Sequence, residues 1–220
     1  VLVAHRGSES PFPENSLPAA VHGAEVTGFV EIDLALTSDG NIVLMHDSTV
    51  DRTTNSSGTV CEFSTSEIAQ LRLRDPAKTE TLHKKCWETN SNATGSSSCM
   101  YFVPTLELVF TTLPMDTKYM LDLKVCFTPG VPQPDPEPVR CNDCARLRRY
   151  VRRLLSRHHI KVKSVVFTST DIQTLRSFAE EFPSASFAFS IDLSFRGYSV
   201  EDFMALLELD DWDAVCMYYG

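Results

Sequence analysis

Apolar and polar residues alternate most regularly over residues 29–36, which read FVEIDLAL. Successive side chains of a β-strand point to opposite faces of a sheet, so this alternation predicts a strand with one fully apolar face. The other face carries two carboxylates, Glu31 and Asp33. Carboxylates are costly to bury unless they bind a cation or pair with other groups, so this strand is the first candidate for a functional site.

A second apolar run follows at residues 42–45, directly after Asp39, Gly40 and one further residue. An Asp-Gly pair between two apolar runs is typical of a two-residue β-hairpin turn. Counting back from that turn places His46 opposite Asp33, and opposed residues share one face of a sheet. We therefore expect the hairpin to bring a histidine to the two carboxylates, a combination that suits metal binding and acid–base chemistry.

Strand and helix patterns alternate through the rest of the chain. Strands are predicted to start at Val1, Phe29, Ile42, Tyr119, Ser164, Ser186 and Ala214, and helices cover 15–26, 104–110, 147–158, 171–182 and 199–209. This alternation predicts an α/β fold with a parallel sheet. A chain of 220 residues can bury one sizeable core, so a single domain over 1–220 is expected.

Residues 119–125 form a second strand that carries polar groups on one face. Asp122 and Lys124 share that face because they are two residues apart. Asp122 could complete a three-carboxylate site with Glu31 and Asp33, or it could form an interior salt bridge with Lys124. Carboxylate oxygens are the ligands that hard cations such as Mg²⁺ and Ca²⁺ prefer.

Five short motifs occur in order within the first 54 residues: AHRG at 4–7, PEN at 13–15, EID at 31–33, TSDG at 37–40 and HD-x3-DRTT at 46–54. Together they resemble the glycerophosphodiester phosphodiesterase family. The resemblance implies a TIM-type (β/α)8 barrel. Seven predicted strands are one short of eight, so we expect the chain to lack the last β/α unit of the barrel. The family usually has Glu where this chain has Asp122, and the Asp form is similar to the animal membrane-anchored branch.

The resemblance also implies a reaction, the metal-dependent hydrolysis of glycerophosphodiesters to glycerol phosphate and an alcohol. The substrate would be a small-molecule glycerophosphodiester or lysophospholipid. Histidine suits the proton transfers because its pKa lies near neutrality. The implied roles are acid and base for His5 and His46, phosphate binding for Arg6 and Lys124, and Mg²⁺ or Ca²⁺ binding for Glu31, Asp33 and Asp122.

Two other functions stay open. A phospholipase of the sphingomyelinase D type has a similar spacing of His, Glu-x-Asp and His, and would stop at a cyclic phosphate. A catalytically inactive barrel could serve as a binding module, which the truncated barrel and Asp122 favour. The presence of both His5 and His46 argues against such decay.

Residues 55–102 are predicted to be an insertion, either a disulfide-tied cap over the barrel mouth or a variable surface segment. One disulfide is expected among Cys61, Cys86 and Cys99. Another is expected among three cysteines beside a proline-rich loop, namely Cys126, Cys141 and Cys144.

Seven cysteines, together with glycosylation sequons at Asn55 and Asn92, indicate an oxidising compartment. We expect the lumen of the secretory pathway or the extracellular side of a membrane, with any anchor outside this chain. The net charge of −9 argues against nucleic acid as a partner, because no basic excess is present to neutralise phosphates. An arginine-rich helix at 147–158 is either a solvated outer face of the barrel or a surface that associates with anionic lipid headgroups.

Overall fold

Strand β1 (Phe29–Leu36) is buried along its whole length and has neighbouring strands on both edges. The computed structural model describes residues 1–7, 12–74, 101–124, 143–192 and 214–218. Within them, six strands form one sheet in the order β2-β1-β3-β4-β5-β6, with β2 antiparallel to β1 and the others parallel. The remaining strands are β2 (Ile42–Leu44), β3 (Lys118–Leu123), β4 (Val165–Ser169), β5 (Ser186–Asp192) and β6 (Ala214–Tyr218).

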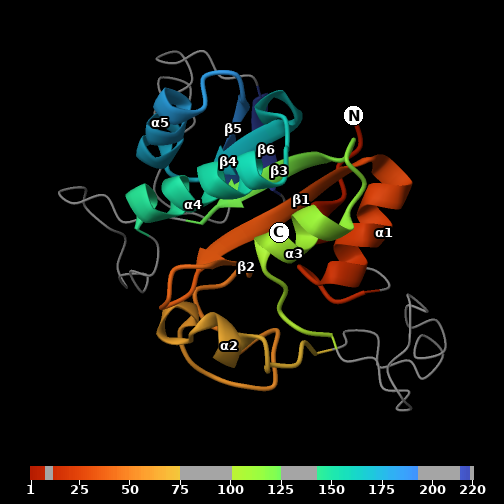
Figure 1. The fold of residues 1–220 in the computed structure, drawn as a ribbon, viewed down its shortest axis with the longest axis vertical. Coiled ribbons are helices and arrows are strands. Elements are labelled where there is room, and N and C mark those ends of the chain that lie inside the picture. The colour runs from red at the N-terminus through yellow and green to blue at the C-terminus, as the bar shows by residue number, and fades with distance from the viewer. Residues whose placement is uncertain (8–11, 75–100, 125–142, 193–213, 219–220) are drawn as a thin grey trace.

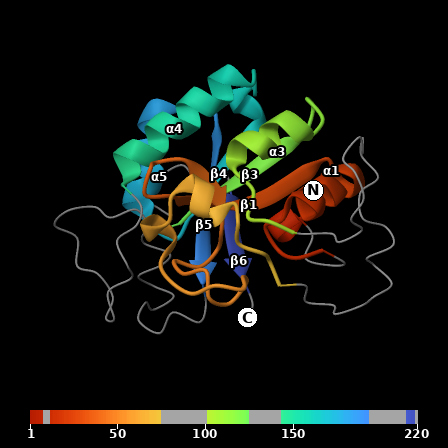
Figure 2. The same cartoon turned by 60° about the horizontal axis from the view of Figure 1, so that its bottom comes forward.

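Four helices cover one face of this sheet, as Figures 1 and 2 show from two directions. They are α1 (Leu17–Thr27), α3 (Leu106–Thr112), α4 (Cys144–Arg157) and α5 (Ile172–Glu181). Their apolar sides pack against the even-numbered side chains of β1 to form the main core. Shorter elements are α2 (Thr65–Ile68) and the 3₁₀ turns η1 (His5–Gly7), η2 (Val60–Glu62) and η4 (Val162–Ser164). The predicted α/β fold is confirmed.

A second, smaller core lies on the opposite face of β1. It includes Ala35 and, from other segments, Val43, Met45, Val50, Val60, Ile68, Leu73 and Val103. Because Ala35 shares its face with Glu31 and Asp33, the chain after β2 packs on the carboxylate side of the sheet. The described parts of the predicted insertion, 55–74 and 101–102, belong to this layer, and 75–100 lie outside the described residues.

The predicted register of the hairpin is wrong by one residue. Leu36 pairs with Ile42, and the loop between Thr37 and Asn41 has three residues instead of two. Gly40 takes a left-handed φ of 86°, which is typical of three-residue hairpin loops and which glycine adopts without a steric penalty. As a result, Met45, and not His46, lies next to Asp33 and donates its backbone N–H to the Asp33 carbonyl at 3.1 Å.

The strand predicted from Val1 is reduced to a single bridge. Ala4 pairs with Val30 in parallel, through hydrogen bonds of 2.9 and 3.0 Å to the backbone of Phe29 and Glu31. The chain then turns at η1, where Arg6 has the left-handed angles φ 48° and ψ 35°. That conformation cannot continue a strand. Since β2 is antiparallel, the described strands that can belong to a parallel barrel are this bridge and five others, not the seven that were predicted.

Helix α1 follows its sequence signals. Ser16 caps its first turn, Pro18 occupies the first turn, and Gly28 ends it with φ 66°. The helix predicted at 199–209 and the proline-rich loop at 129–138 lie outside the described residues. Among the described helices, none has the length and apolar character needed to cross a membrane.

Candidate active site

Three carboxylates converge on the face of the sheet opposite the four helices. Glu31 and Asp33 come from β1, and Asp122 comes from β3, where it pairs directly with Asp33. One oxygen from each lies within 4.8 Å of the others. Only 2%, 1% and 7% of these residues is exposed, respectively. The structure therefore brings together the three residues that the strand patterns placed on one face.

Two residues that precede α1, Arg6 and Asn15, form hydrogen bonds with this cluster. The Arg6 backbone N–H donates to Glu31 Oε2 at 2.7 Å. The Asn15 side chain donates to Asp33 Oδ2 at 2.6 Å and accepts from the Asp33 backbone N–H at 3.1 Å. Arg6 and Asn15 both have a positive φ, 48° and 54°. Asn15 belongs to the PEN motif, from which the sequence patterns predicted no role for it. Its left-handed backbone, which Asn tolerates better than most residues, makes this double contact available.

Lys124 lies between two of the carboxylates. Its Nζ is 2.6 Å from Asp33 Oδ1 and 2.6 Å from Asp122 Oδ2. Burial alone would lower the pKa of Lys124, but the adjacent charges of Asp122 and Asp33 raise it above its usual value. The lysine is therefore a fixed positive charge in the cluster, and the predicted Asp122–Lys124 ion pair is present together with the three-carboxylate arrangement.

The cluster still has an excess of negative charge around Glu31. Burial, followed by repulsion from Asp33 and Asp122, raises the pKa of Glu31 well above its ordinary value. Burial would also raise the pKa of Asp33, but Lys124 and then His46 hold it below the usual value. Burial raises the pKa of Asp122 despite Lys124.

One oxygen of the cluster has no hydrogen-bond donor. Glu31 Oε1 is buried without a hydrogen-bond partner among the described residues, an arrangement that generally costs about 1–3 kcal/mol. A hard divalent cation bound to the three carboxylates would be coordinated by this oxygen and would offset the repulsion among the carboxylates. The donor set therefore fits Mg²⁺ or Ca²⁺.

The two histidines predicted to be acid and base lie on different segments of the chain. His5 is exposed and begins the η1 turn, next to Arg6. His46 follows Met45, and its side chain is 37% exposed. Its Nδ1 lies 2.7 Å from Asp47 Oδ1, a partner that the sequence patterns did not identify beyond the HD motif. His46 is near enough to lower the pKa of Asp33, although it is not paired with Asp33 across the hairpin.

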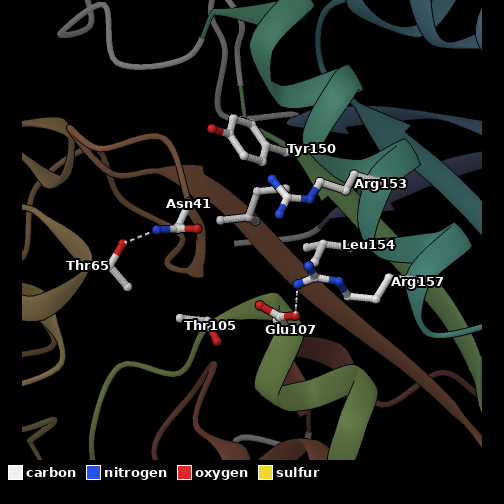
Figure 3. A pocket seen from close by; sticks show the side chains of 9 residues that line it. Asn41, Thr65, Thr105, Glu107, Tyr150, Arg153, Leu154 and Arg157 are labelled. Atoms are coloured by element: carbon white, nitrogen blue, oxygen red, sulfur yellow. Dashed lines mark hydrogen bonds and ion pairs between the residues drawn. The ribbon is translucent and has the colours of Figure 1, made fainter.

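A separate pocket of about 220 Å³ lies on the helix side of the sheet (Figure 3). Ile42, which lines it, pairs with Leu36 and so faces away from the carboxylates. In this pocket Arg157 donates to Glu107 at 2.7 Å. The other lining residues are Asn41, Thr65, Thr105, Tyr150, Arg153 and Leu154. The pocket is therefore not part of the carboxylate site.

The mostly parallel α/β sheet and the cluster of three buried carboxylates define the general class of this protein, an α/β protein with a candidate cation site. The sequence model of the Glycerophosphoryl diester phosphodiesterase family matches residues 5–196, and the chain belongs to this family. It is 48% identical over 82 residues to human Glycerophosphodiester phosphodiesterase 1, a stretch that is 36% of this chain and 24% of the relative. It is 43% identical over 72 residues to the Glycerophosphodiester phosphodiesterase of Caldanaerobacter subterraneus, or 32% of this chain and 30% of the relative. The matched stretches thus span less than a third of these relatives.

Solved structures extend the likeness over nearly the whole chain. A phosphodiesterase of Oleispira antarctica, in complex with the product sn-glycerol-3-phosphate, has a TM-score of 0.68 at 21% identity and covers 98% of this chain and 73% of that one. A glycerophosphodiester phosphodiesterase of Thermotoga maritima has a TM-score of 0.61 at 20% identity and covers 99% and 73%. At these identities the likeness shows the fold, which is of the TIM-barrel type.

Proposed function

We propose that this protein is a phosphoric diester hydrolase that converts glycerophosphodiesters to glycerol phosphate and an alcohol with a divalent cation. The observation that carries the proposal is the convergence of three buried carboxylates in a chain of this family, one of them with an oxygen that no described residue contacts by a hydrogen bond. The product bound to the Oleispira antarctica enzyme supports a small glycerol phosphate ester as the substrate class.

Glu31, Asp33 and Asp122 would hold the cation. When bound, the cation supplies Lewis-acid polarisation of a phosphoryl oxygen. Arg6 and Lys124 place two further positive charges beside the same carboxylates and are the proposed donors to the phosphate. Asn15 keeps Asp33 in position through both of its side-chain groups.

The proposed chemistry uses the glycerol 2-hydroxyl as the first nucleophile. One histidine takes the hydroxyl proton while the new oxygen–phosphorus bond forms, and the other gives a proton to the leaving alcohol as its bond to phosphorus breaks. In the second step, water opens the cyclic phosphate and the two histidines reverse their roles. His46 is prepared for such a transfer because Asp47 contacts its Nδ1, which leaves Nε2 to exchange the proton.

Phosphorus NMR of sn-glycero-3-phosphocholine incubated with the protein tests the proposal. With Mg²⁺ or Ca²⁺, the diester signal should be replaced by the phosphomonoester signal of glycerol phosphate, and a chelator should prevent the change. A cyclic phosphate as the final product would instead identify the chemistry of the sphingomyelinase D type. An unchanged diester at every cation concentration would contradict the proposed activity and favour an inactive barrel.

A further inference from the structure

Arg52, in the DRTT motif, forms ion pairs with two carboxylates that lie far apart in the sequence, Glu14 and Asp47. Its Nε and Nη2 donate to the two oxygens of Asp47 at 2.7 and 3.0 Å. Its Nη1 and Nη2 donate to the two oxygens of Glu14, both at 2.7 Å. Both pairs are therefore bidentate, a geometry that the planar guanidinium can form and an ammonium group cannot.

Each of these carboxylates in turn holds a residue of the candidate active site. Glu14 Oε1 accepts from Arg6 Nη1 at 3.0 Å. Asp47 Oδ1 lies 2.7 Å from His46 Nδ1. The residues form one continuous series of contacts, from His46 through Asp47, Arg52 and Glu14 to Arg6. Arg6 then donates its backbone N–H to Glu31 at 2.7 Å, and its Nε lies 3.6 Å from Asp33 Oδ2.

The two carboxylates of this series, Asp47 and Glu14, remain negatively charged. The hydrogen bond from His46, followed by the one from Arg52, holds the pKa of Asp47 below its ordinary value. Burial would raise the pKa of Glu14, but Arg52 and Arg6 lower it. Both carboxylates therefore stay ionised at neutral pH, and Asp47 remains an acceptor for a proton on His46 Nδ1.

A single exposed ion pair would not justify a functional role, because such pairs generally contribute little to stability. The Arg52 side chain is 48% exposed. Two bidentate pairs on one guanidinium are different, since they fix the relative orientation of the two carboxylates as well as their distance. The segment before α1 and the segment after β2 have no other direct link of this geometry among the described hydrogen bonds.

We propose that Arg52 is a positioning residue that locks His46 and Arg6 into one arrangement by clamping Asp47 and Glu14. The proposal rests on the proposed function for the roles of His46 and Arg6. Arg52 itself touches neither the carboxylate cluster nor, in this proposal, the substrate. It acts through the side-chain orientation and the tautomer of His46, and through the placement of the Arg6 guanidinium.

Arg52→Lys is the central test because it keeps the positive charge and removes the bidentate geometry. We expect kcat on sn-glycero-3-phosphocholine to fall by about 10- to 100-fold, since displacement of a catalytic group by about 1 Å has effects of that size. Arg157→Lys is the matched control. Arg157 has a similarly exposed side chain, 49%, and a 2.7 Å ion pair with Glu107, but it lies on the other side of the sheet. Its kcat should equal that of wild type.

The contacts of Arg52 with Asp47 and with Glu14 can be tested separately. Asp47→Asn should lower kcat mainly, because it releases His46. Glu14→Gln should raise KM mainly, because it releases Arg6. Combining Arg52→Lys with Asp47→Asn should lower kcat by much less than the product of the single effects, because both substitutions break one connection.

Nitrogen-15 NMR of the His46 ring in the metal-free protein gives a readout that needs no activity. The wild-type ring should carry its proton on Nδ1, and both Arg52→Lys and Asp47→Asn should mix the tautomers, with Arg157→Lys unchanged. Unfolding midpoints identify any variant that fails to fold, in which case the other variant decides. Wild-type ring signals in folded Arg52→Lys would overturn the proposal. If the wild-type protein is inactive and the Arg52→Lys and Asp47→Asn variants still lose the Nδ1 proton, only the proposed function is contradicted.

Discussion

Glu31 has surroundings that are unfavourable to its own charge. It is buried, one oxygen has no hydrogen-bond partner among the described residues, and its pKa is raised. Above the ordinary pKa of a glutamate, the unfolded chain loses this proton while the folded, metal-free protein keeps it. The folded state is then penalised by about 1.4 kcal/mol for each pH unit, up to the raised pKa.

Glu31→Gln should therefore stabilise the metal-free protein, because glutamine does not titrate. The gain in free energy of unfolding should be small near pH 5 and larger at pH 7, as urea unfolding at the two pH values would measure. Mg²⁺ should stabilise wild type and not the variant. Glu25→Gln, an exposed change of the same charge on α1, is the control. A lower stability of metal-free Glu31→Gln at pH 7 would contradict this account.

Asp122 has a shorter side chain than the Glu that the family usually has at this position, and one of its oxygens is bonded to Lys124 at 2.6 Å. Asp122→Asn removes one of three anionic ligands and should weaken cation binding. Activity should therefore be low at low metal concentration and partly restored by adding Mg²⁺ or Ca²⁺. If titration calorimetry finds wild-type metal affinity in an inactive Asp122→Asn protein, Asp122 is not a ligand.

His46→Asn tests proton transfer separately from metal binding. The carboxylates are untouched, so metal affinity should be retained. Turnover should fall by roughly 10²- to 10⁴-fold, the usual contribution of a positioned acid or base. Steady-state kinetics at saturating metal measures the change, and a turnover within a factor of about three of wild type would exclude His46 as acid or base.

At the scale of elements, the close packing of η1 on α1 positions the Arg6 amide at Glu31. A Cβ on Gly7 would lie 2.6 Å from Ala20 N and 2.8 Å from Ala19 C, both backbone atoms that cannot easily move. Gly28, at the end of α1, also has a positive φ but has no atom within 4 Å of such a Cβ. Substitutions at the two glycines therefore distinguish the backbone strain of a positive φ, which both positions share, from steric overlap, which only Gly7 would have.

Gly28→Ala should lower the free energy of unfolding by about 1–2 kcal/mol, the strain of a left-handed alanine. Gly7→Ala should lower it further, by about 1–3 kcal/mol, because the methyl group is forced into the α1 backbone. Denaturant unfolding of the two variants measures the difference. Equal losses would show that η1 can move away from α1 without penalty.

Helix α4 presents its arginines mainly to neighbouring elements. Arg152 is paired with Glu181 at 2.5 Å and Arg157 with Glu107 at 2.7 Å. Arg146 and Arg148 donate to backbone carbonyls of Ser38 and Ser177. The Arg152 and Arg157 side chains are nevertheless 64% and 49% exposed, as expected for a solvated outer face of the barrel, and association with anionic lipid stays a separate hypothesis.

At the scale of the whole molecule, the lumenal or extracellular compartment stays a prediction that rests on the cysteines and the sequons. Cys61 is disulfide-bonded, whereas the Cys144 thiol lies 3.4 Å from the Thr174 hydroxyl. The other cysteines expected in disulfides, Cys86, Cys99, Cys126 and Cys141, lie outside the described residues. The sequon residue Asn55 is exposed, and its Oδ1 accepts from the Arg72 backbone. Its Nδ2 is thus the group available to a glycan.

Expression through the secretory pathway should therefore give a glycosylated protein. Digestion with an N-glycosidase should increase its electrophoretic mobility, and Asn55→Gln should remove part of that shift because Asn92 offers a second sequon. The Asn55→Gln protein should keep its unfolding midpoint within a few degrees, since the backbone bonds around residue 55 remain. A secreted protein whose mobility the glycosidase does not change would count against the lumenal assignment.

The sequence alone determined which side chains share a face. The period of two in β1 and β3 is a local property of extended chains, so the convergence of Glu31 and Asp33, and the common face of Asp122 and Lys124, followed directly from spacing. Helix α1 was equally predictable, because Ser16, Pro18 and Gly28 act within single turns. The motifs carried the family resemblance for the same reason, since they are contiguous.

Only the tertiary structure decided how separate segments meet. The hairpin register depended on Gly40 in a three-residue loop, and the spacing of an Asp-Gly pair is compatible with either loop length. The first strand was cut short by the left-handed turn at Arg6, a conformation that the sequence pattern did not indicate. The contacts of Asn15 with Asp33, and of Arg52 with Glu14 and Asp47, join residues 18, 38 and 5 positions apart. Such contacts depend on packing between elements, and periodicity carries no information about them.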